Sequence, residues 1–477
     1  MADSLSSIAL FFFFFIISSS SPPAAAQVSD YHTLFLRPLP ATRQSLSFTP
    51  LLQPESDETS LALELHHVDR IYGDELNATP KALFRMRLQR DAARVKALSD
   101  AAANATVSRR AGGRGADFSS SVISGLSQGS GEYFTRLGVG TPPEYLYMVL
   151  DTGSDVVWLQ CSPCKKCYSQ ADPVFDPKKS KSFSPIRCDT PLCHLLDSPA
   201  CDPLKMCRYQ VSYGDGSFTD GEFSTETLTF RQTRVENVAI GCGHNNQGLF
   251  VGAAGLLGLG RGKLSFPSQA GQRFGGKFSY CLVDRSATSK PSSIVFGDSA
   301  VARRAVYTPL LKNPGLDTFY YVELLGISVG GAAVPGIKTS MFKLDPASAD
   351  GGVIVDSGTS VTRLTSRAYE AMRDAFRKGA TELKLDPRGY SLFDTCYDLS
   401  GKEEVKVPTV VLNFKGANVS LPASNYLIPV DSAGKFCFAF AGTNGGLSII
   451  GNIQQQGFRV VFDMGESKVG FATGGCD

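Results

Sequence analysis

One unusual motif occurs twice in this chain, and the duplication constrains the fold more than any other feature. Residues 148–159 read MVLDTGSDVVWL, and residues 353–364 read VIVDSGTSVTRL. In each copy an apolar stretch ends on an aspartate, Asp151 or Asp356, and a turn with a glycine follows. A carboxylate at the end of a buried strand is costly unless it has a partner or a chemical task. The repeat therefore predicts two related strands that each deliver one aspartate.

A second pair of matching segments follows the two aspartates. Leu256-Leu257-Gly258 begins 105 residues after Asp151, and Ile449-Ile450-Gly451 begins 93 residues after Asp356. A recurrence of this kind indicates two duplicated lobes that share one site between them. From Glu132 onward, short alternating strands are broken by Gly, Pro, Asn and Asp. We therefore expect a mostly β, bilobal fold with a cleft between the lobes.

One segment of this β-rich body has a helical pattern instead. Residues 366–383 read SRAYEAMRDAFRKGATEL, in which apolar side chains recur at helical spacing. The pattern predicts a short helix that buries one face of three residues: Tyr369, Met372 and Phe376.

The first 26 residues are typical of a secretory signal peptide. The apolar run IALFFFFFII at residues 8–17 is followed by AAA at residues 24–26, a small-residue cleavage site before Gln27. A membrane anchor is the alternative, but a spanning helix needs about 20 apolar residues and this run stops at half that length. We expect the protein in the secretory pathway, first of all in the extracellular space (apoplast or cell wall), with the vacuole or the endoplasmic reticulum as alternatives. We expect no stable membrane anchor.

The cysteines and glycosylation sequons fit export. All twelve cysteines lie between Cys161 and Cys476, and an even number in an exported chain predicts disulfides whose pairing the spacing leaves open. The CSPCKKC stretch also has the spacing of a zinc site, but free thiolates are disfavoured in an oxidising compartment. Sequons for N-glycosylation stand at Asn77, Asn104 and Asn418.

Residues 27–125 differ from the body because they contain no cysteine and include a basic helical segment at residues 81–98. A Gly/Ser/Arg-rich linker follows this segment, and such stretches are accessible to proteases. The arrangement predicts a proenzyme. The helical pattern assigns Phe84, Leu88, Ala92 and Val95 to one face, with the basic residues elsewhere: Arg85, Arg87, Arg90, Arg94 and Lys96.

Two facing aspartates can hydrolyse a peptide bond without a covalent intermediate. Adjacent carboxyl groups share one proton, so one acts as general base on a water while the other protonates the carbonyl oxygen. The neighbouring glycines permit tight turns and close backbone approach. The hydroxyl groups are expected to bond the carboxylates or to hold each turn to the opposite lobe. These supporting residues are Thr152, Gly153 and Ser154 in the first motif, and Ser357, Gly358 and Thr359 in the second. Ser154 and Thr359 are assigned to the carboxylates, and Thr152 and Ser357 to the opposite turns.

Both motifs, their Leu-Leu-Gly and Ile-Ile-Gly echoes, and YGDGS at residues 213–217 resemble the pepsin-like aspartic proteases. CSPCKKCYSQADPVFDP, SKSFSPIRCDTPLC and KFSYCL resemble more narrowly the plant nepenthesin-like branch, near the group named aspartic protease in guard cell. The resemblance extends from around Ser130 to the C-terminus. It implies four segments: a signal peptide at 1–26, a pro-segment and linker at 27–125, an N-terminal catalytic lobe at 126–305 and a C-terminal catalytic lobe at 306–477.

The resemblance also implies roles for individual residues. Asp151 and Asp356 would form the catalytic dyad. Tyr213, with Gly214 and Asp215, would lie on a flap over the substrate, and the indole N–H of Trp158 would support Tyr213. Many pepsin-like enzymes have Thr where Asp215 stands, a variation that the nepenthesin-like branch shares. The implied disulfides are Cys161–Cys164, Cys167–Cys242, Cys188–Cys207, Cys193–Cys201, Cys281–Cys476 and Cys396–Cys437.

Two classes of function follow from these features. The first is an acid-favoured aspartic endopeptidase, made as a zymogen, that acts as a monomer on protein or peptide substrates without a metal or other cofactor. The second is a catalytically silent relative that works as a protein-binding inhibitor or receptor. Both aspartate motifs and Tyr213 are intact, which favours the enzyme. A net charge of +2 and the lack of a basic stripe in the body argue against nucleic acid as a partner.

Overall fold

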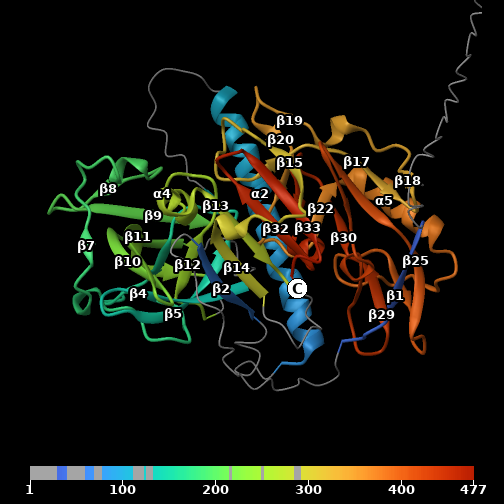
Figure 1. The fold of residues 1–477 in the computed structure, drawn as a ribbon, viewed down its shortest axis with the longest axis horizontal. Helices are drawn as coiled ribbons and strands as arrows, with labels where there is room; N and C mark the ends of the chain where they lie inside the picture. The colour runs from blue at the N-terminus through green and yellow to red at the C-terminus, as the bar shows by residue number, and fades with distance from the viewer. Residues whose placement is uncertain are drawn as a thin grey trace, which may run out of the picture.

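The computed structural model describes residues 30–39, 60–68, 78–110, 123–124, 133–213, 218–248, 252–283 and 292–476. Within these ranges the chain is mostly β (Figure 1). The predicted signal peptide, the sequon at Asn77 and the flap residues Gly214 and Asp215 lie outside the described residues. No helix in the described ranges is long and apolar enough to cross a membrane.

The duplicated motif forms the same strand pairing in each half of the chain. In the first half, β5 (Glu144–Asp151) pairs in parallel with β12 (Gly255–Gly258), so Leu-Leu-Gly lies beside the strand that ends on the aspartate. In the second half, β21 (Val353–Val355) pairs in parallel with β31 (Ser448–Ile450). The repeated spacing therefore corresponds to a repeated parallel pair, and the predicted mostly β, bilobal fold is confirmed.

Further strands and single-turn helices complete the two lobes, green and orange to red in Figure 1. The N-terminal lobe adds β4 (Tyr133–Val139), β6 (Trp158–Gln160), β7 (Ser184–Pro185), β8 (Ala200–Cys201), β9 (Cys207–Tyr213), β10 (Phe218–Phe230), β11 (Thr233–Gln247), α3 (Phe266–Gln269) and α4 (Gly271–Phe274). The C-terminal lobe adds β16 (Tyr321–Val322), β17 (Leu324–Val329), β18 (Ala332–Ala333), β19 (Leu344–Asp345), β20 (Asp350–Gly351), β22 (Thr362–Thr365), β23 (Leu385–Asp386), β24 (Cys396–Asp398), β25 (Glu404–Pro408), β26 (Val410–Phe414), β27 (Ala417–Ser420), β28 (Leu427–Pro429), β29 (Lys435–Phe438), β30 (Phe440–Thr443) and α6 (Asn452–Gln455).

The helix predicted in the C-terminal half is α5 (Ser366–Gly379), which ends at Gly379, before the predicted residue 383. It buries the expected face, formed by Tyr369, Met372 and Phe376. The sequon residue Asn418 lies exposed on β27, where its side-chain oxygen accepts a hydrogen bond from Asn413. Asn104 lies within the helix α2 (Pro80–Arg110). Use of these sequons stays a prediction.

An antiparallel sheet joins the two halves of the chain. Its strand order is β2-β14-β13-β32-β33-β15, so strands from the start, middle and end of the sequence lie side by side. The strands are β2 (Ser60–His67), β14 (Ser292–Gly297), β13 (Lys277–Cys281), β32 (Phe458–Asp463), β33 (Lys468–Thr473) and β15 (Val306–Leu311). The segment that precedes the basic helix is therefore part of the sheet through β2.

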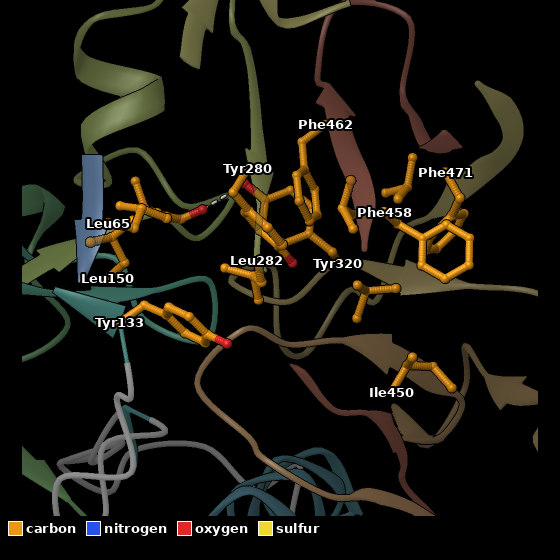
Figure 2. Close-up of a cluster of buried hydrophobic side chains, with 14 of the residues drawn as sticks. Leu65, Tyr133, Leu150, Tyr280, Leu282, Tyr320, Ile450, Phe458, Phe462 and Phe471 are labelled. Atoms are coloured by element: carbon orange, nitrogen blue, oxygen red, sulfur yellow. Dashed lines mark hydrogen bonds between the residues drawn. The ribbon is translucent and has the colours of Figure 1, made fainter. Parts of the chain in front are cut away.

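A buried aromatic and aliphatic cluster packs against this sheet (Figure 2). The ring of Phe462 lies 4.4 Å from that of Tyr320 and 5.6 Å from that of Tyr280, measured between centroids. Leu150, which precedes the first aspartate, and Ile450, from the strand beside β21, belong to the same cluster. Full burial of such side chains is worth about 1.5–3 kcal/mol each. The cluster therefore fixes the positions at which the two aspartate strands end.

Four predicted disulfides are wrong. Eight of the nine cysteines of the N-terminal lobe pair differently from the prediction. β6 runs parallel to β11 and brings Cys161 beside Cys242, with 5.4 Å between their Cα atoms. The observed bonds in this lobe are Cys161–Cys242, Cys164–Cys167, Cys188–Cys201 and Cys193–Cys207. They replace the expected Cys161–Cys164, Cys167–Cys242, Cys188–Cys207 and Cys193–Cys201. The remaining two bonds, Cys281–Cys476 and Cys396–Cys437, pair as expected.

Peptide mapping without reduction separates the two patterns. Trypsin cuts at Lys165 and Lys166, so Cys161 and Cys164 leave in peptide 137–165, Cys167 in peptide 167–178 and Cys242 in peptide 235–261. The observed bonds predict one species of three linked peptides. An unlinked peptide 137–165 with an internal disulfide would contradict them. Mass spectrometry before and after reduction gives the answer.

Candidate active site

The two motif aspartates occupy equivalent, fully buried positions. Asp151 is the last residue of β5 and is 0% exposed, and Asp356 directly follows β21 and is 1% exposed. Each carboxylate accepts a hydrogen bond from the backbone of its own turn. Gly153 N–H donates to Asp151 Oδ1 at 3.0 Å, and Gly358 N–H donates to Asp356 Oδ1 at 3.1 Å. The duplicated sequence thus forms a nearly symmetric pair of carboxylate turns.

The hydroxyl residues after the aspartates tie the two turns together. Ser357 N–H donates to Thr152 Oγ1 at 2.8 Å, and Thr152 N–H donates to Ser357 Oγ at 3.4 Å. Thr152 Oγ1 also lies 3.3 Å from Asp356 Oδ1. These reciprocal bonds cross from one lobe to the other. They hold the two carboxylates face to face.

The next hydroxyl residue behaves differently in the two motifs. Thr359 Oγ1 donates to Asp356 Oδ2 at 2.6 Å, as the sequence suggested. Ser154 does not do the same for Asp151, because its buried Oγ has no hydrogen-bond partner among the described residues. Oδ2 of Asp151 is also buried without such a partner. The symmetry of the sequence is therefore broken at this position.

An arginine from the basic helix lies between the two carboxylates. Helix α2 passes between the green and the orange-red strands in Figure 1 and carries Arg94, whose side chain is 0% exposed. Arg94 Nη2 donates to Asp151 Oδ1 at 2.6 Å and to Asp356 Oδ2 at 2.8 Å, and Nε donates to Asp356 Oδ2 at 3.0 Å. A Cβ atom on Gly358 would lie only 2.4 Å from the guanidinium carbon. Glycine at this turn therefore makes room for the arginine.

The charge of Arg94 is stable in this position. Burial alone would lower the pKa of its guanidinium, but the charges of Asp151 and Asp356 and the hydrogen bonds to them raise that pKa overall. Arg94 is therefore a cation at every pH at which the protein is folded. A buried charge of this kind is tolerated only where opposite charges and hydrogen bonds compensate it.

A second charged residue anchors the same helix one turn earlier. Asp91 Oδ1 accepts hydrogen bonds from the backbone N–H of Ser360 at 2.5 Å and of Val361 at 3.3 Å. Asp91 Oδ2 forms an ion pair with Arg363 Nη2 at 2.6 Å. Residues three apart on a helix face the same side. Asp91 and Arg94 therefore bind the second aspartate motif and the dyad together.

The helix buries most of the expected apolar face and, beside it, charged residues that the sequence assigned elsewhere. Ala92, assigned to the apolar stripe, is exposed, whereas Arg87, Asp91 and Arg94 are 0% exposed. Phe84, Leu88 and Val95 are buried as expected. An apolar stripe predicts burial only against an apolar surface, and here the helix covers a site that presents carboxylates and backbone N–H groups.

The predicted flap corresponds to the hairpin of β9 and β10, in which Ser212 lies opposite Phe218. β3 (Ile123–Ser124), from the predicted linker, pairs in parallel with β9. Trp158 is fully buried in a cluster with residues of β9 and β10. The side chain of Tyr213 lies outside the described residues, so its predicted hydrogen bond to Trp158 stays a prediction. Two residues of the predicted linker thus pair with a strand of the predicted flap.

Asp155, in the first motif, was missed by the sequence analysis. Thr318 Oγ1 donates to its Oδ2 at 2.6 Å, and Gly262 N–H donates to its Oδ1 at 2.8 Å. Burial, and secondarily the charges of Asp317 and Asp197, raise the pKa of Asp155 to about 7. The signal in the sequence was a second carboxylate in the first motif, but most carboxylates in proteins are exposed.

The raised pKa of Asp155 predicts a pH-dependent stability. A carboxyl whose pKa is higher in the folded than in the unfolded state binds more protons when folded, so stability falls as pH rises between about 4 and 7. Asp155 therefore contributes more stability at pH 4.5 than at pH 7.5. The gap obtained by subtracting the Tm at pH 7.5 from the Tm at pH 4.5 should be lower in Asp155→Asn than in wild type by roughly 2 °C or more. Thermal unfolding of both chains at both pH values tests this. An unchanged gap would contradict it, with exposed Asp189→Asn as the control.

Among the described residues, no group of three or more His, Cys, Asp or Glu side chains is arranged to hold a metal ion. The predicted dyad, its supporting turns and Trp158 are placed as described above. Chemically, the site is a pair of carboxylates with one guanidinium between them.

Family comparisons match both halves of the chain. The family described as "Xylanase inhibitor N-terminal" matches residues 133–298, and "Xylanase inhibitor C-terminal" matches residues 319–473. Crystal structures of basic 7S globulin from soybean and of the protein titled edgp are similar in fold. The globulin has a TM-score of 0.58 at 20% sequence identity, and the match covers 72% of this chain and 95% of the globulin. The protein titled edgp has a TM-score of 0.57 at 21% identity, and the match covers 72% of this chain and 91% of that protein.

Curated relatives are much closer in sequence. "Aspartyl protease family protein 2" of Arabidopsis thaliana is 68% identical over 88% of this chain and 86% of its own length. "Protein ASPARTIC PROTEASE IN GUARD CELL 2" of the same plant is 52% identical over 76% of each chain. "Aspartic proteinase nepenthesin-1" of Nepenthes gracilis is 41% identical over 75% of this chain and 81% of its own. The chain therefore belongs to the pepsin-like aspartic endopeptidases, in the plant nepenthesin-like branch.

Proposed function

We propose that the chain is made as a zymogen and, once helix α2 is removed, hydrolyses peptide bonds with a water activated by Asp151 and Asp356. The observation that carries the proposal is the contact of Arg94 with both carboxylates. A single guanidinium can contact both aspartates only because their carboxylates lie side by side. Two carboxylates in that arrangement are also what general acid–base hydrolysis of an amide requires.

The reaction follows from the dyad once its cation has left. Two buried carboxyl groups this close share one proton, since both cannot ionise cheaply. The ionised aspartate removes a proton from a water as the water attacks the substrate carbonyl, and the protonated one donates to the carbonyl oxygen. The bonds between Thr152 and Ser357 keep the two carboxyl groups in register during this exchange. The substrates are proteins or peptides, and the active form is a monomer without a cofactor.

Residues 27–125 act in this proposal as pro-segment and linker, ahead of catalytic lobes at 126–305 and 306–477. Support comes from three contacts: Arg94 with the dyad, β2 between β14 and β4, and β1 (Tyr31–Phe35) along β25. Together they cover the dyad and complete sheets in both lobes. The matured protein is expected to leave the secretory pathway for the extracellular space.

Acid is expected to release this pro-segment. Arg94 keeps its charge in acid, so falling pH weakens the contact only by protonating the carboxylates that hold it. The same protonation prepares the dyad for catalysis. Maturation and activity are therefore both favoured at acidic pH.

A catalytically silent binding protein is the alternative, suggested by the xylanase-inhibitor names of the matching families. Such a protein would not need both aspartates, nor an arginine to neutralise them. The test is cleavage of a denatured protein by the acid-matured chain from pH 3 to 7, with and without a transition-state-mimicking aspartic-protease inhibitor. Acid-favoured, inhibitor-sensitive cleavage supports the enzyme. No cleavage at any pH would favour the silent binding protein.

A further inference from the structure

A carboxylate from the helix is bound on both of its oxygens beside the dyad. Asp91 is 0% exposed and receives two backbone N–H groups on one oxygen and the Arg363 guanidinium on the other. Arg363 itself is only 4% exposed and also donates to Val361 O at 3.3 Å. These donors come from one short segment, directly after Asp356. The segment is thus a built site for a carboxylate group.

Removal of helix α2 would leave this site with an uncompensated cation. Among the described residues, Asp91 is the only carboxylate within ion-pair distance of Arg363. Arg363 and the two backbone N–H groups would then face the opened cleft without their carboxylate, and a cation beside oriented N–H donors attracts an anion. The nearest anions during turnover are those of the bound peptide.

A cavity of about 600 Å³ extends from this site between α2 and the C-terminal lobe. Arg363 and Arg373 both line it, but their partners differ. Arg373 pairs with Asp374 and Asp394, each at 2.9 Å, and both belong to the C-terminal lobe. Arg373 therefore keeps its counter-charges when the helix leaves, and Arg363 does not.

We propose that Arg363 and the backbone N–H groups of Ser360 and Val361 bind a side-chain carboxylate of the substrate in the matured enzyme. The pro-segment residue Asp91 occupies this subsite before maturation. The inference rests on the proposed peptidase function and adds a substrate preference for Glu or Asp. Since positions three apart on a helix lie 5–6 Å apart and an extended chain advances about 3.3 Å per residue, the acidic residue should fall within about three residues of the cut bond.

The test uses peptides that differ only in one residue, Glu or Gln, placed in turn at each position around the cut bond. At one of these positions, the matured enzyme at pH 5.5 should show a kcat/KM at least about tenfold higher for the Glu peptide than for the Gln peptide. At pH 3.5 this ratio should fall toward one, because an ordinary Glu, with a pKa of about 4.3, becomes protonated. Cysteic acid, whose sulfonate stays ionised, should keep the preference at both pH values.

Two variants assign the preference to its residue. Arg363→Gln should bring the Glu to Gln ratio to about one at pH 5.5, whereas the matched control Arg373→Gln should retain the wild-type ratio. Because the ratio is taken within each variant, a general loss of activity does not affect it. If Arg363→Gln fails to fold, the cysteic acid and pH results on the wild-type enzyme decide.

Different results separate this inference from the function on which it rests. Cleavage with a ratio near one at every position overturns the subsite and leaves the peptidase standing. An equal loss of preference in Arg363→Gln and Arg373→Gln also overturns it. If the matured protein cleaves no peptide, the proposed function fails. The subsite is then judged by equilibrium binding of the same labelled peptides, where equal Kd values for Glu and Gln would overturn it.

Discussion

Replacing Asp356 with asparagine is expected to lower kcat/KM for peptide hydrolysis by the matured chain by about 10⁴-fold or more. Asparagine has nearly the same shape, but it can neither take a proton from water nor hold the proton shared with Asp151. General acid and general base steps each contribute about 10²–10⁴-fold, and residues that act as a unit fail together. Initial rates on a denatured protein at acidic pH measure the effect.

Asp151→Asn should produce a loss of the same size, because the two carboxyl groups act as one pair. Asp189→Asn is the matched control, since that side chain is 73% exposed and its partner is the exposed Arg187. Thermal unfolding of each matured variant checks that the fold survives. Activity within tenfold of wild type in either dyad variant would show that catalysis does not depend on the pair.

The second large effect is expected from Arg94→Ala in the uncleaved chain. Removing one partner from a buried ion pair costs about 3–5 kcal/mol, and here it leaves two carboxylates facing each other without a cation. We therefore expect acid conversion to the mature form to speed up at least about tenfold, and its midpoint to move toward neutral pH by about one unit or more. A time course of chain size between pH 3 and 7 measures both quantities.

The direction of this midpoint shift, toward neutral pH, follows from the raised pKa of Arg94. A cation with a raised pKa stabilises the folded chain at all pH values below its ordinary pKa, so acid cannot discharge it. Acid must act on the aspartates instead, and the variant no longer needs that step. Lys96→Ala, at an exposed position on the same helix, is the control. Conversion of Arg94→Ala at the wild-type rate and midpoint would mean that the arginine does not hold the zymogen.

The sequence was enough to predict the architecture because the signal was repeated. The two aspartate motifs and the apolar-apolar-Gly segments after them are the parallel pairs β5–β12 and β21–β31. Because each strand is buried, it needs an apolar run, which is visible in the sequence. The duplication then shows which residues of the two halves occupy equivalent positions. The same logic placed Thr152 and Ser357 on facing turns.

What the sequence could not show depends on distant partners. The burial of Asp91 and Arg94 is set by the dyad, Ser360 and Arg363, all more than 50 residues away in the sequence. Helical periodicity therefore placed Phe84, Leu88 and Val95 correctly but missed the burial of these charged residues. The disulfides failed for a related reason. Cys161 and Cys164 are close in sequence, but the pairing of β6 with β11 places Cys242 beside Cys161.

The central claim is that Asp151 and Asp356 form one catalytic pair that α2 covers until maturation. The most direct measurement is a titration of matured wild-type protein, at acidic pH, with a tight-binding transition-state-mimicking inhibitor, read as residual cleavage of a denatured protein. The account predicts that cleavage falls linearly to zero at one inhibitor per chain. Cleavage that persists at saturating inhibitor, or a matured chain that cuts nothing at any pH, would contradict it.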